Sequence, residues 1–200
     1  MGFLKNRGLT EDERARVPPG QHVVRDFPVL HEGGIPYGGA LPADWDVRVW
    51  GAVEHEARWD FGEFRALPAE EVTCDIHCVT TWSKLDTRWL GVPMSWVLET
   101  VKPLPEATHV VAHAENGYTA NMPLEALTQP GVMLAYRFDG RELEPQHGWP
   151  LRLLVPQLYF WKSAKWLRGL EFRIGDAPGY WEVRGYSNSA DPWREERYGF

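Results

Sequence analysis

Apolar and polar residues alternate along residues 45–51, a period typical of a strand with one buried face. Residues 94–101 carry apolar side chains at helical spacing behind Pro93. We expect further strands at 70–76, 109–114, 132–138 and 170–174, and short helical turns at 60–68 and 124–127. Short strands interspersed with short helices predict a mixed α+β fold.

Turn and cap signals refine this outline. Thr10 followed by Glu13 is a capping box and predicts a short helix, which residues 18–20 (Pro-Pro-Gly) would end. We therefore divide the chain into an N-terminal arm, residues 1–25, and a single domain, residues 26–200. Asn116-Gly117 favours a tight hairpin turn, and residues 89–93 are expected to form a loop before the helix at 94–101.

Composition excludes several classes of protein. The 200 residues carry a formal net charge of −7, so the basic footprint of a nucleic-acid-binding domain is missing. No apolar run reaches the ~18 residues of a membrane-spanning helix, and no export signal is visible, so we expect a cytoplasmic protein. The 11 tryptophans suit either core packing or the wall of a pocket.

The two cysteines lie together in residues 73–82. Cys78 follows the predicted strand 70–76, where a buried strand meets a loop, and a thiolate there is a soft metal ligand or a nucleophile. A zinc site made by Cys74, His77 and Cys78 is an alternative. Structural zinc usually takes two separated ligand pairs, and only His109 and His113 are near enough to complete the set, so we disfavour it.

A second informative stretch is cationic. Arg152 stands in an otherwise apolar strand, where a buried guanidinium is costly unless an anion or a carboxylate meets it. Two lysines and a hydroxyl follow in residues 162–165 (Lys-Ser-Ala-Lys). Together they suit a phosphate or diphosphate. A salt-bridged arginine with solvated lysines is the competing interpretation.

These stretches, in this order, resemble the sulfite oxidase family. The resemblance rests on residues 27–31, 77–83, 117–119, 150–156 and 162–165, and the tail at 180–194 is similar to the bacterial sulfite oxidase-like molybdopterin-binding proteins. It covers the chain from about residue 25 to the end. It implies a mixed-sheet molybdopterin-binding domain and an enzyme whose molybdenum cofactor is held by one pterin dithiolene.

The resemblance also implies a role for particular residues. Cys78 matches the single protein thiolate on the metal, with Trp82 and Thr80 shaping the catalytic pocket. Cys74 lies outside the motif and is expected to be a packed thiol. The cofactor-binding positions that it implies are Arg152, Ser163, Ala164 and Lys165 for the phosphate, and His31, His113 and His147 for the pterin, His147 standing where the family has an asparagine.

One departure bears on the substrate. The sulfite-oxidising members carry arginines after the ligand cysteine, whereas here Val79, Thr80, Thr81, Trp82 and Ser83 follow. A sulfite dianion would lose charge-assisted donors worth ~1.5–3 kcal/mol each. We therefore expect oxygen-atom transfer on a small sulfoxide or N-oxide, with electrons from a separate partner because no haem domain is recognised. A non-catalytic module that binds molybdopterin or an anion is the alternative.

Overall fold

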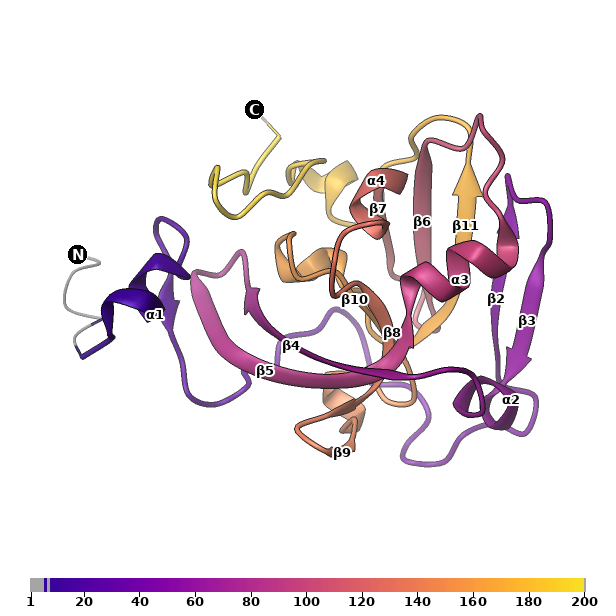
Figure 1. Ribbon diagram of the computed structural model, residues 1–200, viewed down its shortest axis with the longest axis horizontal. Helices are drawn as coiled ribbons and strands as arrows, with labels where there is room; N and C mark the ends of the chain where they lie inside the picture. Colours follow the sequence, from indigo (N-terminus) through magenta and orange to yellow (C-terminus); the bar gives the residue numbers. More distant parts are fainter. Residues whose placement is uncertain (1–5, 7, 200) are drawn as a thin grey trace.

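Two β-sheets and four short α-helices build the computed structural model, which describes residue 6 and residues 8–199 (Figure 1). Mixed sheets with few helices confirm the predicted α+β class. The first sheet contains β1 (His22–Val23), β4 (Glu70–His77), β5 (Trp82–Pro93), β8 (Met133–Phe138), β9 (Arg141–Glu142) and β10 (Arg152–Leu154). The second contains β2 (Asp46–Gly51), β3 (Ala57–Asp60), β6 (His109–Ala114), β7 (Thr119–Pro123) and β11 (Leu167–Arg173).

The long strand β5 organises the first sheet. It pairs antiparallel with β4 and β8, and parallel with β1 at one end. The second sheet has the order β3-β2-β11-β6-β7, in which only β2 and β11 run parallel. Figure 1 shows the β4–β5 hairpin reaching out from the body of the molecule, so that its tip lies between α1 and the C-terminal tail.

The helices are α1 (Glu11–Ala15), α2 (Phe61–Arg65), α3 (Met94–Val101) and α4 (Leu124–Leu127). The capping box predicted for α1 is confirmed, because Thr10 and Glu13 bond reciprocally through side chain and backbone. The helix predicted at 94–101 is α3, whose buried residues are Met94, Val97 and Val101. No helix among the described residues is long and apolar enough to cross a membrane.

The loop expected at residues 89–93 is wrong, because β5 continues to Pro93. Trp89 and Val92 are buried there, and their apolar side chains belong to the core rather than to a connection. Gly91 permits the pairing with β8. A Cβ at this position would come within 2.2 Å of the Leu134 carbonyl oxygen, and the register shifts between Leu90 and Gly91.

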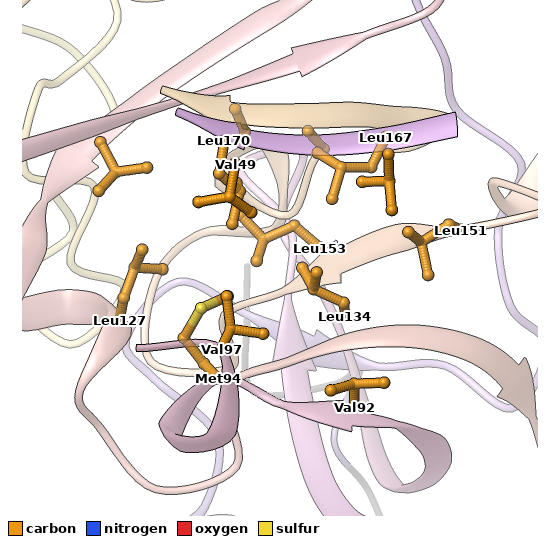
Figure 2. Packing of buried hydrophobic residues seen from close by; sticks show 14 of the residues in the cluster. Val49, Val92, Met94, Val97, Leu127, Leu134, Leu151, Leu153, Leu167 and Leu170 are labelled. Atoms are coloured by element: carbon orange, nitrogen blue, oxygen red, sulfur yellow. The ribbon is translucent and has the colours of Figure 1, made fainter. Parts of the chain in front are cut away.

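The main core lies between the two sheets. Figure 2 shows Val49, Leu167 and Leu170 of the second sheet packing toward Leu134 and Leu153 of the first. A separate apolar cluster follows the first sheet toward the hairpin tip and contains Ile76, Cys78, Trp82, Trp89 and Phe160. The second cluster places Cys78 at the boundary between packed side chains and the candidate site.

Part of the predicted N-terminal arm packs on the sheet. His22 and Val23 form β1 and pair with Trp82 and Ser83, directly beside the hairpin tip. Residues 1–5 and 7 lie outside the described chain. The boundary between residues 25 and 26 stays a prediction.

Candidate active site

A cavity of about 370 Å³ opens between the tip of the β4–β5 hairpin and the residues that follow β10. Most of the residues predicted for the site line this cavity; His113 and His147 do not. The lining residues that were predicted are His31, Cys78, Thr80, Trp82, Arg152, Ser163, Ala164 and Lys165. The structure therefore brings the thiol stretch and the cationic stretch, far apart in sequence, to one hollow.

Cys78 is the first residue after β4, as predicted from the strand-to-loop transition. Its N–H donates to the Trp82 carbonyl at 2.8 Å, and its carbonyl accepts from the Thr81 N–H at 3.0 Å, which closes a tight turn. The Thr80 hydroxyl donates to the Cys78 sulfur at 3.2 Å. Burial raises the pKa of the Cys78 thiol, while this hydroxyl bond and the cations of Lys165 and Arg197 act in the opposite direction.

The zinc alternative finds no ligand set in the structure. The described residues contain no group of three or more His, Cys, Asp or Glu side chains placed to hold a metal. Cys74 packs in the same apolar cluster as Cys78 and lies 3.7 Å from the Thr87 hydroxyl, and burial raises its pKa to about 11. The His77 ring pairs with the Ser83 hydroxyl at 2.8 Å, and burial lowers its pKa to about 4.

Arg152 is fully buried and has no carboxylate partner among the described residues. Its guanidinium donates to the carbonyls of His147 at 2.8 Å and Ser163 at 2.9 Å, and its Cζ lies 4.3 Å from the centre of the Phe160 ring. Burial lowers its pKa to about 9. A cation without an anionic partner at the wall of a cavity is suited to an anionic ligand.

Lys165 adds a second cation to this wall. Its ammonium donates to the carbonyls of Leu30 and Gln146, both at 2.7 Å. Burial, and then the neighbouring Arg152, lower its pKa to about 7. Gly148, at φ +114°, lets these side chains come together, since a Cβ there would lie 3.2 Å from the Cβ atoms of both.

Ser163 and Ala164 form the short connection between Lys162 and Lys165. The Ser163 hydroxyl accepts from the Val155 N–H at 2.9 Å, and the Ala164 carbonyl accepts from the Leu153 N–H at 2.9 Å. Both bonds hold residues 163–164 against β10 and the residue that follows it, Val155. Lys162, which begins the stretch, points elsewhere and binds Glu182 at 2.6 Å.

The three predicted histidines are placed differently. His31 lines the cavity, with Nδ1 2.9 Å from the Gly33 carbonyl. His147 lies behind the cavity wall, stacked on Phe27 with the ring centres 4.0 Å apart. His113 belongs to the second sheet and pairs with Glu171 at 2.9 Å. Neither His147 nor His113 reaches the hollow, and their assignment as pterin contacts stays a prediction.

Sequence reasoning missed the aromatic part of the cavity wall. Tyr118 and Trp161 come from β7's leading turn and from the 3₁₀ helix Phe160–Lys162, and the Tyr118 hydroxyl donates to the Trp161 carbonyl at 2.6 Å. Trp181 and Tyr186 come from the C-terminal tail. The aromatic composition of the tail predicted docking on the domain, but only the fold shows that the tail docks over the cavity.

The lining residues fit a molybdopterin-type group. The lining includes a thiol suited to a soft or high-valent metal and two cations suited to a phosphate. Trp82 supplies a third feature, because its buried indole N–H has no hydrogen-bond partner among the described residues. A buried donor without a partner costs free energy unless a ligand accepts from it.

The fold is that of a molybdopterin-binding oxidoreductase. The chain belongs to the oxidoreductase molybdopterin-binding domain family, whose sequence model matches residues 32–181. It is 45% identical over 198 residues to the uncharacterized oxidoreductase YuiH of Bacillus subtilis, covering 99% of this chain and 98% of that protein. The predicted family, fold and enzyme class are thereby confirmed, and the family implies a molybdenum cofactor.

More distant relatives bear on chemistry and fold. The chain is 28% identical over 178 residues to the putative protein-methionine-sulfoxide reductase subunit YedZ1 of Azospira oryzae, covering 88% of this chain and 67% of that one. It is 29% identical to the protein-methionine-sulfoxide reductase catalytic subunit MsrP of Gluconobacter oxydans, over 70% of this chain and 50% of that one. The sulfane dehydrogenase SoxCD of Paracoccus pantotrophus shares the fold, with a TM-score of 0.60, 21% identity, and 84% and 54% coverage.

Proposed function

We propose that this oxidoreductase uses its molybdenum cofactor to reduce a small sulfoxide- or N-oxide-type substrate. One observation carries the proposal: a single cavity is lined by the Cys78 thiol, the buried guanidinium of Arg152 and the half-buried ammonium of Lys165. Cys78 would ligate the metal, and Arg152 with Lys165 would hold the phosphate of the pterin. The bound cofactor would supply two-electron oxygen-atom transfer.

The wall near Cys78 supports a neutral, dipolar substrate over sulfite. Val79, Trp82, Phe160 and Trp161 line this part of the cavity and bring no formal charge. Arg152 is held by carbonyl oxygens, and Lys165 is held in the same way, so both are fixed on the side proposed for the phosphate. The names of the YedZ1 and MsrP relatives, which specify the methionine sulfoxide of proteins, agree with a sulfoxide as the reacting group.

The overall reaction requires an external source of electrons. Reduction of a sulfoxide consumes two electrons and two protons and releases a thioether and water. We propose a separate electron-transfer partner, in agreement with the YedZ1 and MsrP relatives, whose names describe each as a subunit of a reductase. We also propose a reducing compartment such as the cytoplasm, where the free thiols of Cys74 and Cys78 would stay reduced.

The test begins with purified protein from a host that makes the molybdenum cofactor. We expect about one molybdenum and one pterin per chain, and reduction of sulfoxides or N-oxides with an artificial electron donor. Cys78→Ser should abolish turnover while circular dichroism and the unfolding midpoint stay close to those of the wild type. Cys74→Ser is the matched control and should keep both metal and activity.

The outcomes separate the alternatives. Protein without molybdenum or pterin would refute the proposal. Protein that holds the cofactor but turns over no sulfoxide, N-oxide or sulfite would instead indicate a binding module. Oxidation of sulfite as the preferred reaction would refute the substrate class alone.

A further inference from the structure

One residue from the N-terminal region and one from the C-terminal tail bind the turn that carries Cys78. Gln21 precedes β1, and its side-chain amide donates to the Cys78 carbonyl at 3.0 Å. Arg197 lies in the C-terminal tail, and its guanidinium donates to the Val79 carbonyl at 2.6 Å. Both residues fall outside residues 32–181, the part matched by the family. Figure 1 shows the N-terminal segment and the tail converging on the tip of the β4–β5 hairpin.

The turn itself has few internal bonds. The Cys78 N–H and the Thr81 N–H bond to carbonyls across it, and the Thr80 hydroxyl bonds to the Cys78 sulfur. Thr81 has a φ of +76°, a conformation that β-branched residues rarely adopt. A turn held in this way opens easily unless neighbouring groups fix it. Gln21 and Arg197 bind the carbonyls of two successive residues, so they restrain the backbone at the position that aims the sulfur.

The environment of these two side chains makes the restraint strong. Gln21 is buried, and the side chain of Arg197 is 15% exposed, with its guanidinium 5.0 Å from the centre of the Tyr159 ring. The Arg197 guanidinium also lies close to Gly20, because a Cβ on Gly20 would be 3.2 Å from Arg197 Nη2. Hydrogen bonds from a charged donor in such a site are stronger than those at a wet surface.

We propose that Gln21 and Arg197 are positioning residues that hold the Cys78 turn in the geometry required for metal ligation. The proposal rests on the proposed function in taking Cys78 as the metal ligand. The two residues act together on one turn although positions 21 and 197 are far apart in sequence. Neither side chain lines the cavity, so both would act through the backbone of residues 78 and 79.

Hydrogen–deuterium exchange of the full-length protein tests the restraint, read at peptides covering residues 77–83. Arg197→Met keeps most of the aliphatic stem and removes the donor. We expect exchange in this peptide to accelerate about tenfold, which corresponds to about 1.4 kcal/mol. Gln21→Leu should accelerate it less, and Arg197→Lys should restore part of the protection. Arg194→Met is the matched control, because that side chain is 75% exposed and contacts Glu196.

A second measurement addresses the metal. In the holoenzyme, Arg197→Met should change the optical absorption and the electron paramagnetic resonance of the metal–thiolate centre, whereas Arg194→Met should not. A purely structural role would leave these spectra unchanged at full metal content. Because exchange needs no cofactor, a protein that never binds molybdenum would fail the proposed function and still report on the restraint.

Any of three results would overturn the proposal. The first is unchanged exchange at residues 77–83 in both Arg197→Met and Gln21→Leu. The second is acceleration that extends equally to residues 46–60, the strands β2 and β3 away from the cavity, which would show global destabilisation. Acceleration confined to 77–83 with unchanged spectra would also overturn it, since the turn would then be restrained without any effect on the metal.

Discussion

Two fully buried cations lie close together in sequence and have opposite surroundings. Lys162 meets a carboxylate, at 2.6 Å from Glu182, and its ammonium also donates to the Asn121 carbonyl at 2.7 Å. Arg152 meets only carbonyl oxygens and faces the cavity. Burial lowers the pKa of both groups, but for Lys162 the charge of Glu182 acts against the shift.

The difference separates a structural charge from one suited to a ligand. Glu182 begins the 3₁₀ helix Glu182–Arg184 and also accepts from the Trp161 indole at 2.7 Å, so the Lys162 pair fastens the tail to the aromatic wall. Arg152 forms no ion pair with a described residue and donates only to backbone carbonyls. A buried cation that lacks an anion in the protein is the natural counterpart of an anion brought by a ligand.

The largest expected effect comes from breaking the Lys162–Glu182 pair. Lys162→Met should lower the free energy of unfolding by about 3–5 kcal/mol, because it leaves the Glu182 carboxylate, 2% exposed, buried without its cation. The double variant Lys162→Met/Glu182→Gln should recover much of this loss. Urea unfolding followed by fluorescence measures both. A loss below about 1 kcal/mol in the single variant would contradict the structural assignment.

Arg152→Met should affect ligand retention more than folding. It leaves no carboxylate stranded, only the carbonyls of His147 and Ser163 without a donor. We expect cofactor occupancy to fall about 10- to 100-fold, the equivalent of about 1.5–3 kcal/mol for hydrogen bonds to a charged group. Molybdenum and pterin content per chain measure it. The folded double variant Lys162→Met/Glu182→Gln should keep its cofactor. An equal loss of cofactor in this variant and in Arg152→Met would contradict the assignment of Lys162 to structure and of Arg152 to the ligand.

This contrast shows how far sequence reasoning reaches. The unusual position of Arg152 in an apolar strand and the placement of Cys78 after β4 were visible in the pattern, because each breaks a local rule. The division of labour between Lys162 and Lys165 was not. Both stand in one four-residue stretch, and only the 3₁₀ helix Phe160–Lys162 decides that one turns to Glu182 and the other to the cavity.

The remaining errors and omissions also concern features that are decided by residues distant in sequence. The loop expected at 89–93 failed because Gly91 and Pro93 suggest a break when seen alone, whereas the partner strand β8 accommodates them. Nothing in the sequence around His113 shows which sheet its strand joins. Its placement on the second sheet depends on the pairing of β6 with β11. Gln21 and Arg197 could not be assigned, because nothing local in the sequence indicates that both bind the turn at residues 78–81.

The second cation of the cavity provides a pH test of the comparison. Burial and Arg152 hold the pKa of Lys165 at about 7, so its positive charge is lost as the pH rises through 7. Sulfate, whose charge is constant in this range, should bind the cofactor-free protein up to about tenfold more weakly at pH 8 than at pH 6. Calorimetric titration measures this, and Lys165→Met should remove the dependence.

The same shift has a consequence for folding, with a defined sign. Between about pH 7 and the ordinary lysine pKa of 10.5, the unfolded chain keeps a proton on Lys165 that the folded chain has released. The stability of the cofactor-free protein should therefore gain a contribution from Lys165 as the pH rises through this window. A wild-type profile identical to that of Lys165→Met would show that Lys165 titrates normally, and would place it with the solvated lysines.

The smallest expected effect lies on the thiol side of the cavity. Thr80→Val removes the hydroxyl that donates to the Cys78 sulfur at 3.2 Å and keeps the shape of the side chain. A single hydrogen bond to sulfur should change the free energy of unfolding by less than about 1 kcal/mol and turnover by less than about fivefold. Thr80→Ser retains the hydroxyl and should behave as the wild type. A loss of turnover as complete as that of Cys78→Ser would mean that Thr80 contacts the reacting atoms. The uncharged residues near Cys78 would then contribute to the reaction directly, and not only the thiol and the cations Arg152 and Lys165.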